Sequence, residues 1–328
     1  MVDPALSRAK LVAEVLLKHW RISDPAIQTH LGLSRATWCI APFYWLSQAE
    51  QTRSAELSGQ TNLLFALDRH LKSENSSISV PEVVATDGGA RIVVDSGYVW
   101  CLTRNLQGFQ PDVADPEIYP LLTEGLARFH HALRVFSERR PTHAPDGIWV
   151  RARQNIERLF ADPFVAFTSY PRERELLQQA AEWLLPRLDR FELLPRQIVH
   201  GDWTPRNVLF DRADQPIGLT AVLDFEAMSC APVHVDVANT CSTLLMWSGL
   251  DRLDERIDNV LDTYQRSAGV HLEREDIHTA MLAHWLCHYW SWRERLQYGE
   301  FGREVKERLC LRISSVLSYV SKATTGSQ

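Results

Sequence analysis

The feature that constrains this chain most is a polar stretch in its second half, where functional side chains follow two apolar segments. The first apolar segment, residues 197–199, is followed closely by Asp202, and a short loop then leads to Asn207. The second, residues 219–223, leads directly into Asp224. Short apolar runs bounded by turn residues are typical of strands. The pattern therefore predicts a rigid β-structure that holds two carboxylates and one amide.

This set of side chains suits phosphoryl transfer, whose transition state needs positioning and neutralisation of charge more than covalent chemistry. We expect Asp202 to be the catalytic residue, which accepts the proton of an attacking hydroxyl. Asn207 and Asp224 would hold Mg²⁺, a hard ion that prefers oxygen ligands. Taken singly, Asp202 could cap a turn and Asn207 could bond the loop backbone, which are common roles for these residue types.

The same stretch resembles the aminoglycoside phosphotransferase family, which also includes choline, homoserine and hydroxylysine kinases. The catalytic-loop motif of that family, H-G-D-x-x-x-x-N, is matched here by His200, Gly201, Asp202 and Asn207. Its metal motif, D-F/W-[DE], is matched by the three residues from Asp224 to Glu226. Segments similar to the family also lie at 126–130 and 231–238, so the resemblance covers about residues 120–240.

The resemblance implies an α+β, protein-kinase-like fold with two lobes and with ATP and Mg²⁺ as cofactors. The predicted lobes are a small β-rich N-terminal lobe for the nucleotide, residues 1–105, and a larger helical lobe for catalysis and substrate binding, residues 106–328. The apolar patterns agree with this division. They predict helices at 4–20 and 52–71, and strands at 26–31, 36–41, 43–46, 80–85, 91–95 and 98–103. They predict further helices at 116–139, 147–160, 171–190, 233–248, 251–268, 273–297 and 303–321.

The N-terminal lobe departs from the kinase pattern at the residues that grip phosphate. Kinases carry a basic residue on the third strand, paired with a glutamate on the following helix. Ser47 occupies the basic position here, whereas Glu56 matches the helix glutamate and Arg53 is a nearby base that could pair with it. Residues 32–35 form a poor glycine-rich loop with a single glycine. We expect the nucleotide to be bound by these residues and by the hinge: Arg53, Glu56, Leu102 and Arg104.

The helices after the metal motif are expected to face the acceptor. They carry many carboxylates, which together with tryptophans would suit an ammonium-bearing alcohol through cation–π contact. His284 and His288 lie one helical turn apart and could line a pocket, although core packing explains the same residues. Asp236, at the start of one of these helices, is predicted to bond the backbone of the catalytic loop.

Composition narrows the class of protein further. The formal charge of −6 over 328 residues gives no basic surface for nucleic acid or an anionic membrane, and it would suit a cationic ligand. No apolar run is long enough to span a bilayer, and the chain starts without a signal-peptide pattern. The six scattered cysteines indicate a reducing compartment, so we expect a cytoplasmic protein. The sequence does not indicate the oligomeric state.

These observations predict an ATP-dependent O-phosphotransferase that acts on a hydroxyl of a small molecule. The acceptor would be an aminoglycoside-like antibiotic or an amino-alcohol metabolite. The alternative is a degenerate kinase-fold protein that binds nucleotide or a partner without turnover, which the serine at position 47 favours. The short interval between the metal motif and Asp236 argues against a protein kinase, because it leaves no room for an activation segment.

Overall fold

A computed structural model describes residues 4–31, 36–139, 154, 156–158, 171–212, 218–247, 252–292 and 299–325. The chain divides into two compact units. The first unit comprises Met1–Gly108 together with Thr220–Glu226, and the second comprises Phe109–Leu219 together with Ala227–Gln328. The predicted nucleotide-loop segment 32–35 and most of the predicted helix 147–160 lie outside the described residues.

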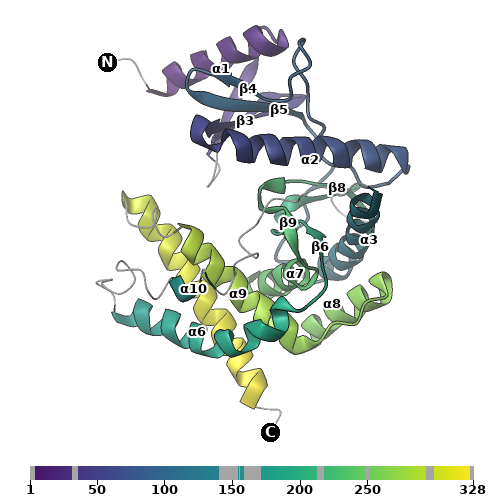
Figure 1. The fold of residues 1–328 in the computed structure, drawn as a ribbon, viewed down its shortest axis with the longest axis vertical. Helices are drawn as coiled ribbons and strands as arrows, with labels where there is room; N and C mark the ends of the chain where they lie inside the picture. The colour runs from purple at the N-terminus through teal and green to yellow at the C-terminus, as the bar shows by residue number, and fades with distance from the viewer. Residues whose placement is uncertain are drawn as a thin grey trace. The chain divides into compact units, whose positions relative to one another are not determined.

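The first unit is built on an antiparallel sheet with the strand order β1-β2-β3-β5-β4. Its strands are β1 (Ala26–Leu31), β2 (Ala36–Ala41), β3 (Tyr44–Glu50), β4 (Val93–Asp95) and β5 (Tyr98–Arg104). Helix α1 (Pro4–Trp20) lies on one face of this sheet, whereas α2 (Ser54–Ser73) lies on the other, and the short 3₁₀ turn η1 (Gln51–Arg53) joins β3 to α2 (Figure 1).

The face of the sheet below α1 holds the main core of this unit. The side chains alternate along each strand, so every second residue of β2, β3 and β5 points to α1. Trp38 and Trp100 stack there with their ring centroids 5.7 Å apart. They pack against Val12, Leu16 and the neighbouring aliphatic residues of the same cluster, all of them buried. On the other face the hydroxyl of Thr61 in α2 contacts the thiol of Cys101 at 3.7 Å.

One predicted strand is wrong. Residues 80–85 run beside β5 but form only an isolated bridge, between Val83 and Thr103, instead of a ladder. Proline at position 81 explains the difference, because it has no N–H to donate to a strand partner. The other predicted strands of this unit are confirmed, with β3 longer than expected and β4 shorter.

The second unit is mainly helical and confirms the helices that apolar spacing predicted, with ends shifted by a few residues. Its helices are α3 (Ile118–Arg139), α6 (Pro171–Glu192), α7 (His234–Trp247), α8 (Leu253–Ala268), α9 (Arg274–Trp292) and α10 (Gly299–Thr325). Within this unit α9 packs against α6, α7 and α10, while α3 packs against α7 and α8.

Short strands carry the polar stretch, of which residues 220–226 belong to the first unit and the rest to this one. Strand β6 (Arg196–Val199) pairs antiparallel with β9 (Ser229–Pro232). The apolar pattern did not predict strand β9. Strand β7 (Val208–Phe210) follows the loop after β6, and β8 (Leu219–Val222) comes next in the chain. Among the described residues no helix is long and apolar enough to cross a membrane.

Asp95 anchors helix α1 to the β4–β5 turn. Its carboxylate accepts hydrogen bonds from Lys18 Nζ at 2.6 Å, His19 Nε2 at 2.8 Å and Ser96 Oγ at 2.9 Å. The bonds from Lys18 and His19 hold the pKa of Asp95 well below its ordinary value. The charged carboxylate therefore stabilises the folded state. This stabilisation is fully present above pH 3.8, the ordinary pKa of aspartate, and it is lost as the pH falls well below that value.

We predict that Asp95→Asn lowers the free energy of unfolding by about 1 to 3 kcal/mol, because hydrogen bonds to a charged group are lost. Asp87→Asn is the matched control, since the Arg21–Asp87 pair joins the end of α1 to the same region but is largely exposed. It should cost less than about 0.5 kcal/mol. Urea unfolding at pH 7 measures both. Equal losses in the two variants would contradict an anchoring role for Asp95.

Candidate active site

The loop after β6 begins with a glycine that no other residue can replace without strain. Gly201 has φ +84°, and a Cβ atom at this position would lie 2.1 Å from the carbonyl oxygen of Ala227. The register of β6 with β9, in which Val199 lies opposite Ser229, brings these backbones together. The conformational freedom of glycine is therefore required by both the backbone angle and the close approach.

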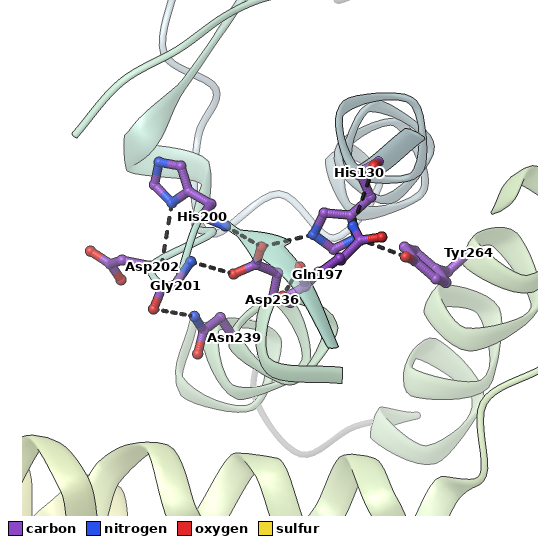
Figure 2. A network of polar contacts seen from close by, with 9 residues as sticks. His130, Gln197, His200, Gly201, Asp202, Asp236, Asn239 and Tyr264 are labelled. Atoms are coloured by element: carbon purple, nitrogen blue, oxygen red, sulfur yellow. Dashed lines mark hydrogen bonds and ion pairs between the residues drawn. The ribbon is translucent and has the colours of Figure 1, made fainter. Parts of the chain in front are cut away.

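The carboxylate of Asp236, at the start of α7, holds this turn by its backbone. Its two oxygens accept from the backbone N–H of His200 at 2.8 Å and of Gly201 at 2.7 Å. Asp236 is completely buried, so bonds from charged or polar groups are needed to offset its desolvation. Figure 2 shows the carboxylate between the loop and His130 of α3. The two bonds to the loop confirm the role that the sequence predicted for Asp236.

His130 completes the set of donors around Asp236. Its Nε2 lies 2.8 Å from Asp236 Oδ2, and its Nδ1 lies 2.7 Å from the hydroxyl of Tyr264 in α8. Because the carboxylate can only accept, Nε2 carries the proton and Nδ1 accepts from the tyrosine. Burial, with the nearby charge of Asp236 as a second cause, raises the pKa of Tyr264, so this hydroxyl stays a donor. Three helices thus meet at one carboxylate (Figure 2).

Two further side chains hold the same loop. Asn239, one helical turn after Asp236, donates from Nδ2 to the carbonyl of Gly201 at 3.1 Å. The ring of His200 accepts from the backbone N–H of Asp202 at 3.3 Å and is fully buried against Trp203. The backbone around Asp202 is therefore bonded on both sides of the turn.

The loop places Asp202 and Asn207 together. Asn207 Nδ2 donates to the carboxylate of Asp202 at 2.9 Å and to its backbone carbonyl at 2.8 Å. These two bonds orient the amide, so its oxygen must point away from Asp202. Within the described part of the chain that amide oxygen and Asp202 Oδ1 make no hydrogen bond, which leaves one acceptor on each residue for other groups.

Asp224 belongs to the segment 220–226 of the first unit. It is exposed and has φ +56°, in the left-handed region that aspartate tolerates better than most residues. In the same segment the backbone carbonyl of Glu226 accepts from Gln60 Nε2 of α2 at 3.1 Å. This bond ties the end of the predicted metal motif to α2 within the first unit.

Arg53 and Glu56 form the pair that their spacing suggested. Arg53 Nε donates to one carboxylate oxygen of Glu56 at 3.0 Å, and the terminal nitrogen donates to the other at 2.6 Å. The hydrogen bond to Glu56 is the largest cause of the raised pKa of Arg53, to which Glu226 and Glu50 also contribute. A fixed positive charge therefore lies in the first unit near the segment that carries Asp224.

The hinge residues are placed on β5. Leu102 lies in the core, and its carbonyl accepts from the backbone N–H of Val84 at 2.8 Å. Arg104 donates its backbone N–H to the carbonyl of Glu82 at 2.9 Å, and its guanidinium lies near that glutamate. Each residue thus uses one backbone group within the first unit. Their contact with a nucleotide base stays a prediction.

The carboxylates that favoured a cationic acceptor are engaged in ion pairs within the second unit. Arg274 binds Asp258 and Asp254, the latter at 3.1 Å. The remaining pairs join Glu255 to Arg252, Glu273 to His271, Glu275 to Arg187 and Asp276 to Arg190. Their negative charge is therefore largely compensated by basic side chains of the chain itself.

Two groups near Asp202, Asn239 and Arg312, were not found from the sequence. Asn239 lies one turn beyond Asp236, and that spacing was the available signal. Arg312 of α10 and His288 of α9 both feel the charge of Asp202, which acts to raise the pKa of each. No local pattern links Arg312 to Asp202, because more than a hundred residues separate them along the chain.

A model of the phosphotransferase enzyme family matches residues 49–277, which is most of the chain. The chain belongs to the phosphotransferase enzyme family. Among curated proteins, the homoserine kinase of Zymomonas mobilis subsp. mobilis is 28% identical over 180 residues. That alignment covers 54% of this chain and 51% of the kinase, so this family member spans about half the length of the curated relative it matches.

Solved structures of similar fold are kinases of small molecules. A microcompartment-associated aminopropanol kinase has a TM-score of 0.66 at 17% identity and covers 97% of this chain and 98% of its own. The amicoumacin kinase hAmiN, in complex with AMP-PNP, Ca²⁺ and Ami, has a TM-score of 0.66 at 12% identity and covers 95% and 96%.

The aminoglycoside phosphotransferase APH(3'')-Id from Streptomyces rimosus, in complex with ADP and streptomycin, has a TM-score of 0.62 at 17% identity. That alignment covers 89% of this chain and all of the other. At these identities the likeness concerns the fold. It confirms the predicted α+β, protein-kinase-like fold with a small sheet-rich part and a larger helical part.

We predict that Gly201→Ala lowers the free energy of unfolding by about 1 to 3 kcal/mol, because the added methyl group meets the Ala227 carbonyl and the backbone angle is strained. Gly218→Ala is the control, since a Cβ there meets nothing within 4 Å. It should change stability by less than about 0.5 kcal/mol. Thermal unfolding of both variants tests this. An unchanged midpoint in Gly201→Ala would show that the two backbones do not approach as described.

Proposed function

We propose that this protein is an ATP-dependent phosphotransferase that moves the γ-phosphate of ATP to a hydroxyl of a small molecule. The observation that carries the proposal is the pairing of Asp202 with Asn207 in a loop whose backbone Asp236 holds. This loop presents a carboxylate oxygen and an amide oxygen that make no other bond within the described chain. Both side chains are half-buried, so these two oxygens are accessible to a substrate or a metal ion.

In the proposed reaction the acceptor hydroxyl donates a hydrogen bond to Asp202 Oδ1. Its oxygen attacks the γ-phosphorus of ATP as the bond from that phosphorus to the bridging oxygen breaks, and ADP leaves. The hydroxyl proton passes to Asp202. The bond from Asn207 keeps the carboxylate from rotating away, so positioning supplies much of the rate enhancement.

Asn207 and Asp224 are proposed to hold magnesium. Both offer hard oxygen donors, and the orientation of the Asn207 amide fits this role because its nitrogen is used by Asp202. A bound magnesium ion would neutralise charge on the phosphates of the nucleotide. Glu226 could add to this set or serve only to orient the segment through its bond from Gln60.

Arg53 is proposed to bind the phosphates of ATP in place of the absent strand lysine. Ser47 lies on β3, opposite Cys101 of β5, and carries no charge. Arg53 follows the end of the same strand and is bonded to Glu56 through Nε and one terminal nitrogen of its guanidinium. The pair reproduces the base–glutamate arrangement of kinases with the base moved a few residues along the chain. We further propose that Leu102 and Arg104 flank the base of the nucleotide.

The acceptor is proposed to be a small alcohol. The similar proteins include kinases named for homoserine and aminopropanol and an enzyme in complex with streptomycin. These three molecules differ in size, but all carry hydroxyl groups. We propose the cytoplasm as the place of action. The use of ATP supports this, and so do the described cysteines, which are all free. The competing function is a kinase fold that binds nucleotide without turnover, and the missing lysine is the observation in its favour.

We predict that Asp202→Asn lowers kcat by about 100- to 10,000-fold, because the group that accepts the proton is removed. The dissociation constant of ATP should change little. Asp211→Asn, in the exposed turn after β7, is the control and should keep full activity. ATP consumption is measured over a panel of aminoglycosides and amino alcohols that includes homoserine. Turnover that survives in Asp202→Asn would remove the assigned base, and ATP binding without turnover of any acceptor would favour the competing function.

We predict that Arg53→Met weakens binding of ATP about 10- to 100-fold, since a charge-assisted contact to phosphate is lost. Arg69→Met on α2 is the control, because Arg69 is exposed and lies over the ring of Phe65. Calorimetric titration with AMP-PNP and magnesium compares the variants. Equal affinity in Arg53→Met and the wild type would show that another group grips the phosphates.

A further inference from the structure

Arg312 lies in the second unit on α10 and reaches the ring of Trp285 in α9. Its guanidinium carbon is 4.5 Å from the centre of that ring, and the residue is half-buried. A planar guanidinium that stacks on an aromatic face keeps its N–H donors along the edge, where they can bind a planar anion with two parallel hydrogen bonds. The stacking therefore orients the donors of Arg312 and leaves them for a partner.

No carboxylate in the described part of the chain forms an ion pair with Arg312. Three arginines of the same and neighbouring helices differ from it in this respect. Arg274 and Arg190 bind acidic residues, and Arg308, one turn earlier on α10, binds Glu304. Burial lowers the pKa of Arg312, but an arginine side chain stays charged at any ordinary pH. A half-buried charge without a partner is costly, which favours a ligand that supplies one.

The surroundings of Arg312 add positive charge and little negative charge. Arg206 and Arg308 both act on it as like charges, and Asp202 is the acidic group that acts on it. His284 and His288 lie 4.4 Å apart between their ring centres, and burial lowers the pKa of both, so they are neutral. Asp202 attracts Arg312 more strongly than either arginine repels it, but three guanidinium groups, including that of Arg312, share this one carboxylate, and the positive charge suits an anionic ligand.

Asp202 connects this region to the proposed chemistry. Its charge acts on both Arg312 and His288, so the positive group lies on the same side of the second unit as the proposed catalytic carboxylate. A small acceptor whose hydroxyl meets Asp202 would bring its other polar groups to α9 and α10. This step rests on the proposed function, since it takes Asp202 as the residue that meets the hydroxyl.

We infer that Arg312 binds a carboxylate of the acceptor, and that the acceptor is a small hydroxy acid. The carboxylate would accept two hydrogen bonds from the edge of the guanidinium, while one face of the guanidinium stays packed on the ring of Trp285. The inference narrows the acceptor class beyond a small alcohol. It is compatible with an amino group on the same molecule, but it does not require one.

Direct binding tests this without turnover. Homoserine, 4-hydroxybutyrate and glycerate are each titrated calorimetrically into the full chain beside their primary amides, which differ only in the lost charge. At least one acid should bind about 10- to 100-fold more tightly than its amide. Arg312→Leu should abolish this preference and Arg312→Lys should keep part of it. Arg303→Leu, which removes an exposed charge from the same helix, should leave it unchanged.

The outcomes separate this inference from the proposed function. Selective binding of an acid that depends on Arg312 supports the carboxylate site even if the protein hydrolyses or transfers no phosphate. The inference is overturned if no acid binds better than its amide, or if Arg312→Leu weakens acid and amide equally. It is also overturned if Arg312→Leu weakens binding of AMP-PNP and magnesium while leaving the acids unaffected, because the anion bound would then be nucleotide phosphate. Thermal unfolding of each variant verifies that it is folded.

Discussion

The buried carboxylate of Asp236 is the group on which the rest of the site depends. It gathers the backbone of the catalytic loop, the ring of His130 and, through that ring, the hydroxyl of Tyr264. An isolated buried charge would be strongly unfavourable, and here the bonds that offset the cost come from the loop after β6 and from α3. The same bonds that keep the charge stable therefore determine the path of the loop, and with it the position of Asp202.

The two compact units hold their proposed functional side chains in different ways. In the second unit the proposed catalytic residues are held by backbone bonds from deeply buried side chains. In the first unit the residue proposed to bind phosphate is Arg53, which lies near the surface. Two hydrogen bonds to Glu56 hold its guanidinium in place. In the proposed function this pair takes the place of a strand lysine at position 47, and the short 3₁₀ turn brings Arg53 to the start of α2.

The sequence predicted the parts of the fold that repeat a simple pattern. The long helices and most strands of the first sheet follow from apolar spacing, and Asp202, Asn207 and Asp236 from motif spacing. It failed where local signals conflict or are missing. Residues 80–85 are apolar enough for a strand, but proline removes a donor. Strand β9 has the sequence Ser-Cys-Ala-Pro, without branched or aromatic residues, so only its pairing with β6 reveals it. Arg312 approaches Asp202 through tertiary packing, which spacing cannot express.

The way in which Asp236 holds the loop has a consequence for how the family can diverge. It bonds main-chain N–H groups, which every amino acid except proline supplies, so the support does not depend on the side chain at position 200. The side chain at that position is therefore constrained only by its own bond to the Asp202 N–H and by its buried packing against Trp203. Position 201 has no such freedom, since its backbone angle and the Ala227 carbonyl admit only glycine. Neighbouring residues of one motif thus evolve under unequal constraint.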